Sequence, residues 1–170
     1  MRLFFALWPP AATAHALAQW AGEVQRDAGG RATAEDTIHL TLAFLGDADA
    51  QKAISSARKV LAGPFEMKID AARYWKHNRI VWVGPAQMPP ALQALVQELH
   101  QSLRQDGFAL EDRPFAAHIS LVRKANPPKS IPPLPRVEWP ASEFLLVRSV
   151  PTGRGSRYEP VERFPLHGNP

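Results

Sequence analysis

The sequence predicts an α+β fold in which antiparallel strands are mixed with helices. Short apolar runs of strand-like composition recur along the whole chain, and three longer segments carry apolar residues at helical spacing. Two of the strand-like runs are separated only by a short polar turn, which indicates a hairpin. Hairpins mixed with helices are typical of α+β proteins rather than of folds with a parallel sheet.

The first half of the chain contains two helical patterns and four strand-like runs. The helix that starts at Ala11 has apolar residues at Leu17, Trp20 and Val24, and Gly29-Gly30 ends it. A turn at His77-Asn78 joins the two strands of the predicted hairpin. The predicted helices are 11–26 and 49–61, and the predicted strands are 2–8, 38–45, 65–75 and 79–83.

The second half adds one helix and three strands around a proline-rich stretch. The stretch at 126–135 reads NPPKSIPPLP and cannot pair within a central sheet. We interpret it as an extended surface connection, and the alternative is a lid over a site. The predicted helix is 89–105, and the predicted strands are 116–122, 143–150 and 158–166.

Length and composition suit one soluble domain with a substantial core. The chain has 170 residues, of which 45% are hydrophobic and 21% charged. It has no cysteine, which excludes a disulfide framework, a thiolate metal site and a cysteine nucleophile. The net charge of +4 is compatible with a phosphate-bearing partner and equally with an ordinary basic surface.

The N-terminus resembles a signal peptide only superficially. The apolar run from Leu3 to Trp8 is too short for a secretion signal or a membrane span, and Pro9 and Pro10 end it. We therefore predict a buried first strand and a cytoplasmic protein.

Two short segments, HLTL and HISL, share one pattern. His39 is followed two residues later by Thr41, and His118 is followed two residues later by Ser120. Residues two apart in a strand point to the same face, so each histidine shares a face with a hydroxyl. Arg123 lies five residues after His118, and strict alternation would place it on the opposite face unless a bulge turned it back.

Two histidines, two hydroxyls and an arginine suit displacement at phosphorus. One neutral imidazole can act as a base while a protonated one acts as an acid, because imidazole titrates near neutrality. Hydroxyls can donate hydrogen bonds to phosphate oxygens, and arginine supplies a fixed positive fork. The chemistry needs no metal or other cofactor, and the residues alone do not say which histidine is the acid.

Other interpretations of the same residues remain open. A single histidine in an apolar strand is more often a hydrogen-bonded core residue. The two histidines could also bind a metal with Asp36, Asp47 or Asp112, but no HExxH motif or acidic cluster accompanies them.

These motifs make the sequence resemble the two-histidine phosphoesterase superfamily, and within it the bacterial and archaeal RNA 2′,3′-cyclic phosphodiesterases, also called 2′-5′ RNA ligase-like proteins. The similar segments are RLFFALWPP, HLTLAFLG, RIVWVG, RPFAAHISLVRK and SVPTGRGSRYEPVERFPL. The resemblance implies one bilobal domain over 1–170, in which two pseudo-symmetric antiparallel-sheet lobes with outer helices surround a central cleft.

The resemblance also implies an activity and roles for the motif residues. The expected reaction is hydrolysis of an RNA-terminal 2′,3′-cyclic phosphate to a 2′-phosphate, with possible reverse 2′-5′ ligation. His39 would be the proton donor and His118 the proton acceptor, and Thr41, Ser120 and Arg123 would bind phosphate. The expected partners are RNA ends, tRNA fragments among them, and the protein is expected to be a monomer that does not bind membranes.

Two alternatives to this activity remain open. One is a phosphodiesterase for small cyclic nucleotides or an ADP-ribose cyclic phosphate, and the other is a non-catalytic module that binds RNA or nucleotides. Four aromatic residues could stack on a base, although core packing explains each of them as well: Phe4, Trp82, Phe115 and Tyr158.

Overall fold

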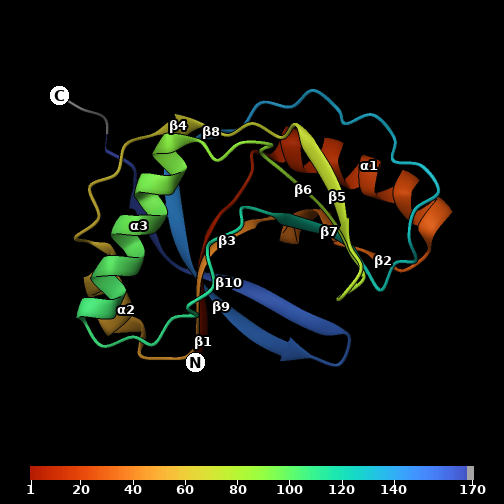
Figure 1. Ribbon diagram of the computed structural model, residues 1–170. Helices are drawn as coiled ribbons and strands as arrows, with labels where there is room; N and C mark the ends of the chain where they lie inside the picture. Colours follow the sequence, from red (N-terminus) through yellow and green to blue (C-terminus); the bar gives the residue numbers. More distant parts are fainter. Residues whose placement is uncertain (168–170) are drawn as a thin grey trace.

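The computed structural model describes residues 1–167 and consists of two antiparallel sheets with helices on their outer sides (Figure 1). Within these residues each main sheet has four strands. A third sheet consists of two short strands that are far apart in the sequence. The α+β prediction is confirmed.

The first sheet has the strand order β10-β9-β1-β3 and packs against two helices. All its strand pairs are antiparallel. Side chains alternate along β1, so that Leu3, Phe5 and Leu7 enter the main core while Phe4 and Ala6 face the opposite side. The elements are β1 (Arg2–Leu7), β3 (Leu40–Asp47), β9 (Glu143–Thr152), β10 (Gly155–Pro165), α2 (Ala50–Ala57) and α3 (Pro90–Gln105).

The second sheet has the order β2-β7-β6-β5, and α1 (Ala11–Ala28) packs on its outer side. Helix α1 buries Leu17, Trp20 and Val24, the residues whose spacing predicted it. Burying one such side chain contributes about 1.5–3 kcal/mol. The remaining elements are β2 (Arg31–Ala32), the 3₁₀-helix η1 (Glu35–Thr37), β4 (Phe65–Glu66), β5 (Ala71–Trp75), β6 (Ile80–Gly84), β7 (Ile119–Arg123) and β8 (Pro140–Ala141).

Several predicted strand boundaries are wrong. β3 does not stop before Gly46-Asp47, because these two residues pair with Leu3 and Arg2 of β1. The predicted strand 65–75 is two strands, since β4 pairs with β8 and β5 pairs with β6. The hairpin of β5 and β6 is confirmed.

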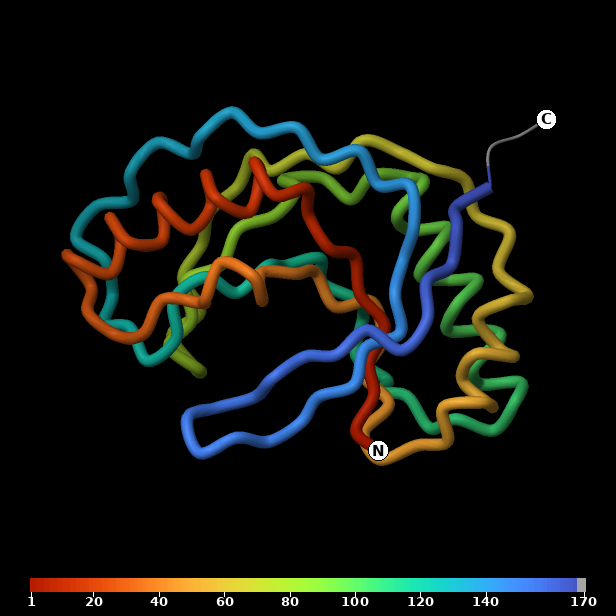
Figure 2. The backbone as a smooth tube through the Cα atoms, turned by 180° about the vertical axis from the view of Figure 1, so that it is seen from behind, coloured from red at the N-terminus to blue at the C-terminus, as the bar shows by residue number. Residues whose placement is uncertain are grey.

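The hairpin of β9 and β10 is longer than its sequence predicts. Strand β1 pairs with β9 only as far as Ser149, and beyond it β9 pairs with β10 alone up to Thr152. The hairpin therefore extends past the sheet as a two-stranded arm, drawn in blue in Figures 1 and 2. Its tip, PTGRGSR, has no apolar alternation, so hydrophobic periodicity gave no signal for a strand there.

The proline-rich stretch lies along α1 (Figure 2). The indole nitrogen of Trp20 donates to the carbonyl oxygen of Pro132 at 3.0 Å, and the amide of Lys129 donates to Asp27 at 2.9 Å. The stretch lines none of the cleft that holds the two motifs, so its interpretation as a lid is wrong. Across residues 1–167, none of the helices has the length and apolar character needed to cross a membrane.

Candidate active site

The two motifs meet where the two sheets come together. Strands β3 and β7 contact each other, one from each sheet. A cleft of 290 Å³ opens at this junction, and the five residues singled out by the sequence all line it: His39, Thr41, His118, Ser120 and Arg123.

Each histidine lies immediately before its strand and makes the same backbone contact. Nδ1 of His39 lies 2.6 Å from the carbonyl oxygen of Thr37, and Nδ1 of His118 lies 2.9 Å from that of Ala116. A carbonyl oxygen only accepts hydrogen bonds, so each Nδ1 carries the proton and donates. In both neutral rings Nε2 is therefore the nitrogen with a free lone pair, as a general base requires.

A β-bulge places Arg123 beside the second motif. In the ladder between β6 and β7, Trp82 pairs with Ser120 and Val81 pairs with Val122, so Leu121 is an extra residue. One extra residue reverses the alternation of the side chains that follow. Arg123 therefore lines the cleft together with Ser120, and the bulge resolves the ambiguity about its face.

The first motif contains the equivalent bulge. Thr41 pairs with Ala6 and Ala43 pairs with Phe5, which leaves Leu42 as the extra residue. Phe44 thus takes the place after Thr41 that Arg123 takes after Ser120, and its side chain is 51% exposed.

The carbonyl groups of both bulge residues are satisfied from outside the regular ladders. Nε2 of His100, on α3, donates to the carbonyl oxygen of Leu42 at 2.8 Å. The amide of Thr33 donates to that of Leu121 at 2.8 Å. These bonds hold the bulges in place, and with them the side chains that face the cleft.

The cleft is lined by positive charge without acidic neighbours. Arg31, Arg123 and Arg154 line it together with the two histidines, and no Asp or Glu is among its lining residues within 1–167. None of the three arginines forms an ion pair with another described residue. Positive side chains in a partly enclosed site favour an anionic ligand.

Aromatic rings surround His39. Trp8 stacks on its ring with 4.8 Å between centroids and 12° between planes, while Phe4 and Tyr158 lie at 5.2 and 5.3 Å. Burial lowers the pKa of His39 from 6.5 to about 4, and the positive charge of Arg123 contributes to the lowering.

His118 has a similar but more open environment. Trp75 lies edge-on to its ring at 4.7 Å between centroids. Burial is the main cause that lowers the pKa of His118, and the charge of Arg123 adds to it. Without an anion in the cleft, His39 is thus neutral at pH 7, and the same causes favour the neutral form of His118.

The lowered pKa of His39 makes stability depend on pH. The unfolded ring takes up a proton below pH 6.5, whereas the folded ring does so only near pH 4. The contribution to stability is complete above pH 6.5 and is lost as the pH falls towards 4. In denaturant unfolding, we expect the decrease for wild type to exceed that for His39→Leu by at most about 3 kcal/mol, because the lowered pKa of His118 contributes equally in both proteins. Equal decreases in both proteins would contradict this.

The acidic candidates for a metal site do not meet at the cleft. Asp47 pairs with the N-terminal amine, and neither Asp36 nor Asp112 is among the cleft residues. Within the described part of the chain, no group of three or more His, Cys, Asp or Glu residues is placed to hold a metal ion.

The aromatic candidates fall into two groups. Phe4 is only 3% exposed and packs beneath the motif, whereas Tyr158 lines the cleft and Phe115 lines a neighbouring groove. Trp82 packs within the second sheet near His118. Phe44 could not be predicted from the sequence, because strict alternation would place it on the face opposite to Thr41.

Comparisons with known proteins place the chain in one family. Residues 7–82 match the family described as LigT like phosphoesterase. The RNA 2′,3′-cyclic phosphodiesterase of Escherichia coli K12 is 36% identical over 172 residues, covering 97% of this chain and 96% of that protein. The enzyme of that name from Thermus thermophilus is 31% identical, covering 99% and 91%. The crystal structure of E. coli LigT complexed with 3′-AMP has a TM-score of 0.89 at 34% identity, with 97% of each chain covered.

Proposed function

Since the chain belongs to the LigT-like phosphoesterase family, we propose that it is an RNA 2′,3′-cyclic phosphodiesterase that leaves a 2′-phosphate and uses two histidines without a metal. The membership confirms the resemblance seen in the two motifs. The observation that carries the proposal is the pair of matched imidazoles, each with Nδ1 held by a backbone carbonyl and Nε2 free, in one basic cleft.

The proposed reaction is an in-line displacement at phosphorus. Nε2 of His118 takes a proton from water, and the water oxygen forms the new bond to phosphorus. The bond between phosphorus and the ribose 3′-oxygen breaks, and protonated His39 donates its Nε2 proton to that oxygen. Thr41, Ser120 and Arg123 stabilise the phosphoryl charge. If the 5′-hydroxyl of another RNA end attacks phosphorus in place of water while the bond to the 3′-oxygen breaks, the same groups join the two ends through a 2′-5′ linkage.

The substrate itself helps His39 to become the acid. The negative charge of a bound phosphodiester raises the pKa of neighbouring imidazoles and opposes the lowering caused by burial. The stacked face of Trp8 also favours the protonated ring through a cation–π interaction. His39 therefore acquires its proton together with the substrate.

Phe44 supports an RNA or nucleotide substrate. Its exposed ring lines the spaces on both sides of Thr41, and the guanidinium of Arg2 lies 5.8 Å from its centroid. An exposed aromatic ring beside a phosphate site is a platform on which a base can stack.

Residues 1–170 form one monomeric catalytic unit in this proposed function. One chain supplies both histidines, so a second copy is not needed to complete the cleft. RNA ends with a cyclic phosphate are the proposed substrates, and tRNA fragments are one source of them. Cytoplasmic location stays a prediction.

The test is to incubate the protein with a short oligoribonucleotide that ends in a 2′,3′-cyclic phosphate, in the presence of EDTA. We expect full turnover and a product with a 2′-phosphate. Turnover only after a divalent metal is restored would mean that the histidines are metal ligands. Binding without turnover under either condition would favour the non-catalytic alternative.

A further inference from the structure

Two arginines stand directly opposite each other beside the cleft. Arg31 of β2 and Arg123 of β7 are partners in the antiparallel ladder. Like charges at opposed positions destabilise a sheet, and neither arginine has an acidic partner among residues 1–167. The arrangement is explained if both side chains bind anions.

The backbone holds Arg31 firmly in this place. Gly30 has φ +83°, and a Cβ atom there would lie 2.3 Å from the carbonyl oxygen of Arg123. The amide and the hydroxyl of Thr33 donate to the carbonyl oxygens of Leu121 and Ser120, each at 2.8 Å. Arg31 is therefore fixed beside the catalytic strand by close backbone contact on both sides.

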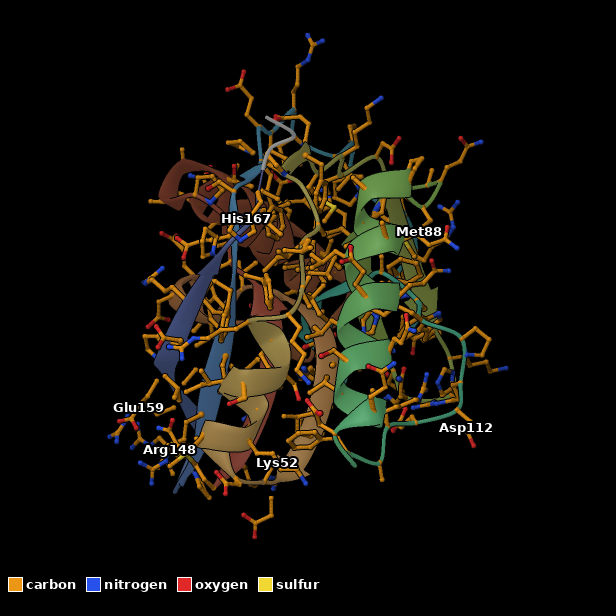
Figure 3. All side chains as sticks on the ribbon, turned by 90° about the vertical axis from the view of Figure 1, so that its left-hand side faces the viewer. Lys52, Met88, Asp112, Arg148, Glu159 and His167 are labelled. Carbon is orange, nitrogen blue, oxygen red and sulfur yellow. The ribbon has the colours of Figure 1, made fainter. Side chains whose placement is uncertain are left out.

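A third arginine approaches from the opposite wall, on the hairpin arm of β9 and β10. Arg154 lines the cleft and has no ion pair within the described chain. Arg157, the other arginine of the arm, pairs with Glu159 at 2.9 Å, and Arg148, in the part of β9 that pairs with β1, lies 3.7 Å from the same carboxylate. Figure 3 shows Arg148 and Glu159 together on this hairpin. Of the arm's two arginines, only Arg154 is therefore available for a ligand in the cleft.

We propose that Arg31 and Arg154 form a second anion subsite that binds the phosphate on the 5′ side of the reacting nucleotide. The inference rests on the proposed function, in which Arg123 and the motif residues hold the cyclic phosphate. The Cα atoms of Arg31 and Arg123 are about 5 Å apart as ladder partners, so their side chains can diverge to two phosphates of one nucleotide. A nucleoside 2′,3′-cyclic phosphate has no second phosphate, whereas an RNA end or a 5′-phosphorylated nucleotide has one.

The kinetic test compares substrates that differ at the 5′ position. The substrates are adenosine 2′,3′-cyclic phosphate, its 5′-phosphorylated form, and the adenylyl dinucleotide with either a natural or an uncharged methylphosphonate linkage. We expect a 5′ phosphate of either kind to raise kcat/KM about 10-fold, and the methylphosphonate to abolish the gain. A gain for the mononucleotide alone would assign the subsite to 5′-nucleotides, and one for the dinucleotide alone to RNA.

In each variant we would measure kcat/KM for the substrate with the 5′ phosphate and divide it by kcat/KM for the substrate without it. In Arg31→Gln and Arg154→Gln the ratio is expected to fall towards 1, whereas Arg157→Gln, on the same arm but paired with Glu159, keeps it. An unchanged ratio in the first two variants would overturn the proposal. So would a gain that persists with the methylphosphonate, because the subsite would then not recognise charge.

A binding measurement decides the question even if the protein proves not to hydrolyse these substrates. Isothermal titration calorimetry with adenosine 2′-monophosphate and adenosine 2′,5′-bisphosphate is expected to show about 10-fold tighter binding of the bisphosphate. The difference should disappear in Arg31→Gln. Equal affinities in wild type would overturn the subsite, whereas a preference without turnover would overturn only the proposed catalysis.

Discussion

Replacing His39 or His118 with alanine is expected to lower kcat for a cyclic phosphate end by about 10²–10⁴-fold, the usual contribution of a general acid or base. Each ring presents Nε2 to the cleft because Nδ1 is bound to a backbone carbonyl, and alanine can neither take up nor donate a proton. The measurement is single-turnover cleavage of a labelled oligonucleotide at saturating enzyme.

Loss of activity must be separated from loss of structure. His15→Ala is the matched control, since His15 is exposed on α1 and pairs with Glu35. We expect this variant to keep wild-type kcat. Circular dichroism and oligonucleotide binding should show that the two motif variants still fold and bind. If either retained wild-type kcat, the corresponding histidine would have no role in proton transfer.

The pH profiles of the wild-type enzyme test whether bound substrate raises the pKa of the histidines. The profile of kcat/KM reports the free enzyme, in which burial lowers the pKa of both histidines. The profile of kcat reports the substrate complex, in which the phosphate charge raises these values. The pKa at which kcat declines with rising pH should therefore be higher than the corresponding pKa of kcat/KM.

Gly30→Ala is expected to destabilise the protein by about 1–3 kcal/mol or more and to reduce activity as well. The φ of +83° is unfavourable for alanine, and the added Cβ would collide with the carbonyl oxygen of Arg123 at 2.3 Å. Since backbone atoms cannot swing aside as a side chain can, β2 must move away from β7. That shift displaces Arg31 and Arg123 from the cleft.

Variants of two other glycines separate the effect of the close contact from that of backbone strain. Gly29 has φ +71° and ψ −158°, and no atom lies within 4 Å of the position that an added Cβ would take, so Gly29→Ala is expected to cost only the conformational strain of about 1–3 kcal/mol. Gly22, inside α1, has neither a positive φ nor a close contact, and Gly22→Ala should stabilise by about 0.5–1 kcal/mol. Denaturant unfolding measures the stability of the three glycine variants, and kcat/KM measures their activity. If Gly29→Ala and Gly30→Ala lost equal stability and activity, the close contact with Arg123 would have no effect.

The sequence by itself determined the kind of fold and the residues that meet at the cleft. Apolar spacing identified the three helices, and the repeated His-x-Thr/Ser pattern identified the residues that line the cleft, because residues two apart share a face in any strand. These are local properties, set by the periodicity of the backbone.

Tertiary structure decided what depends on partners distant in the chain. The bulges at Leu42 and Leu121 exist only relative to β1 and β6, so the positions of Phe44 and Arg123 could not be read from alternation. In the same way, Arg31 gained its place only through the ladder with β7. A short polar strand carries no periodic signal, and its position is set by the hydrogen bonds of the strand beside it.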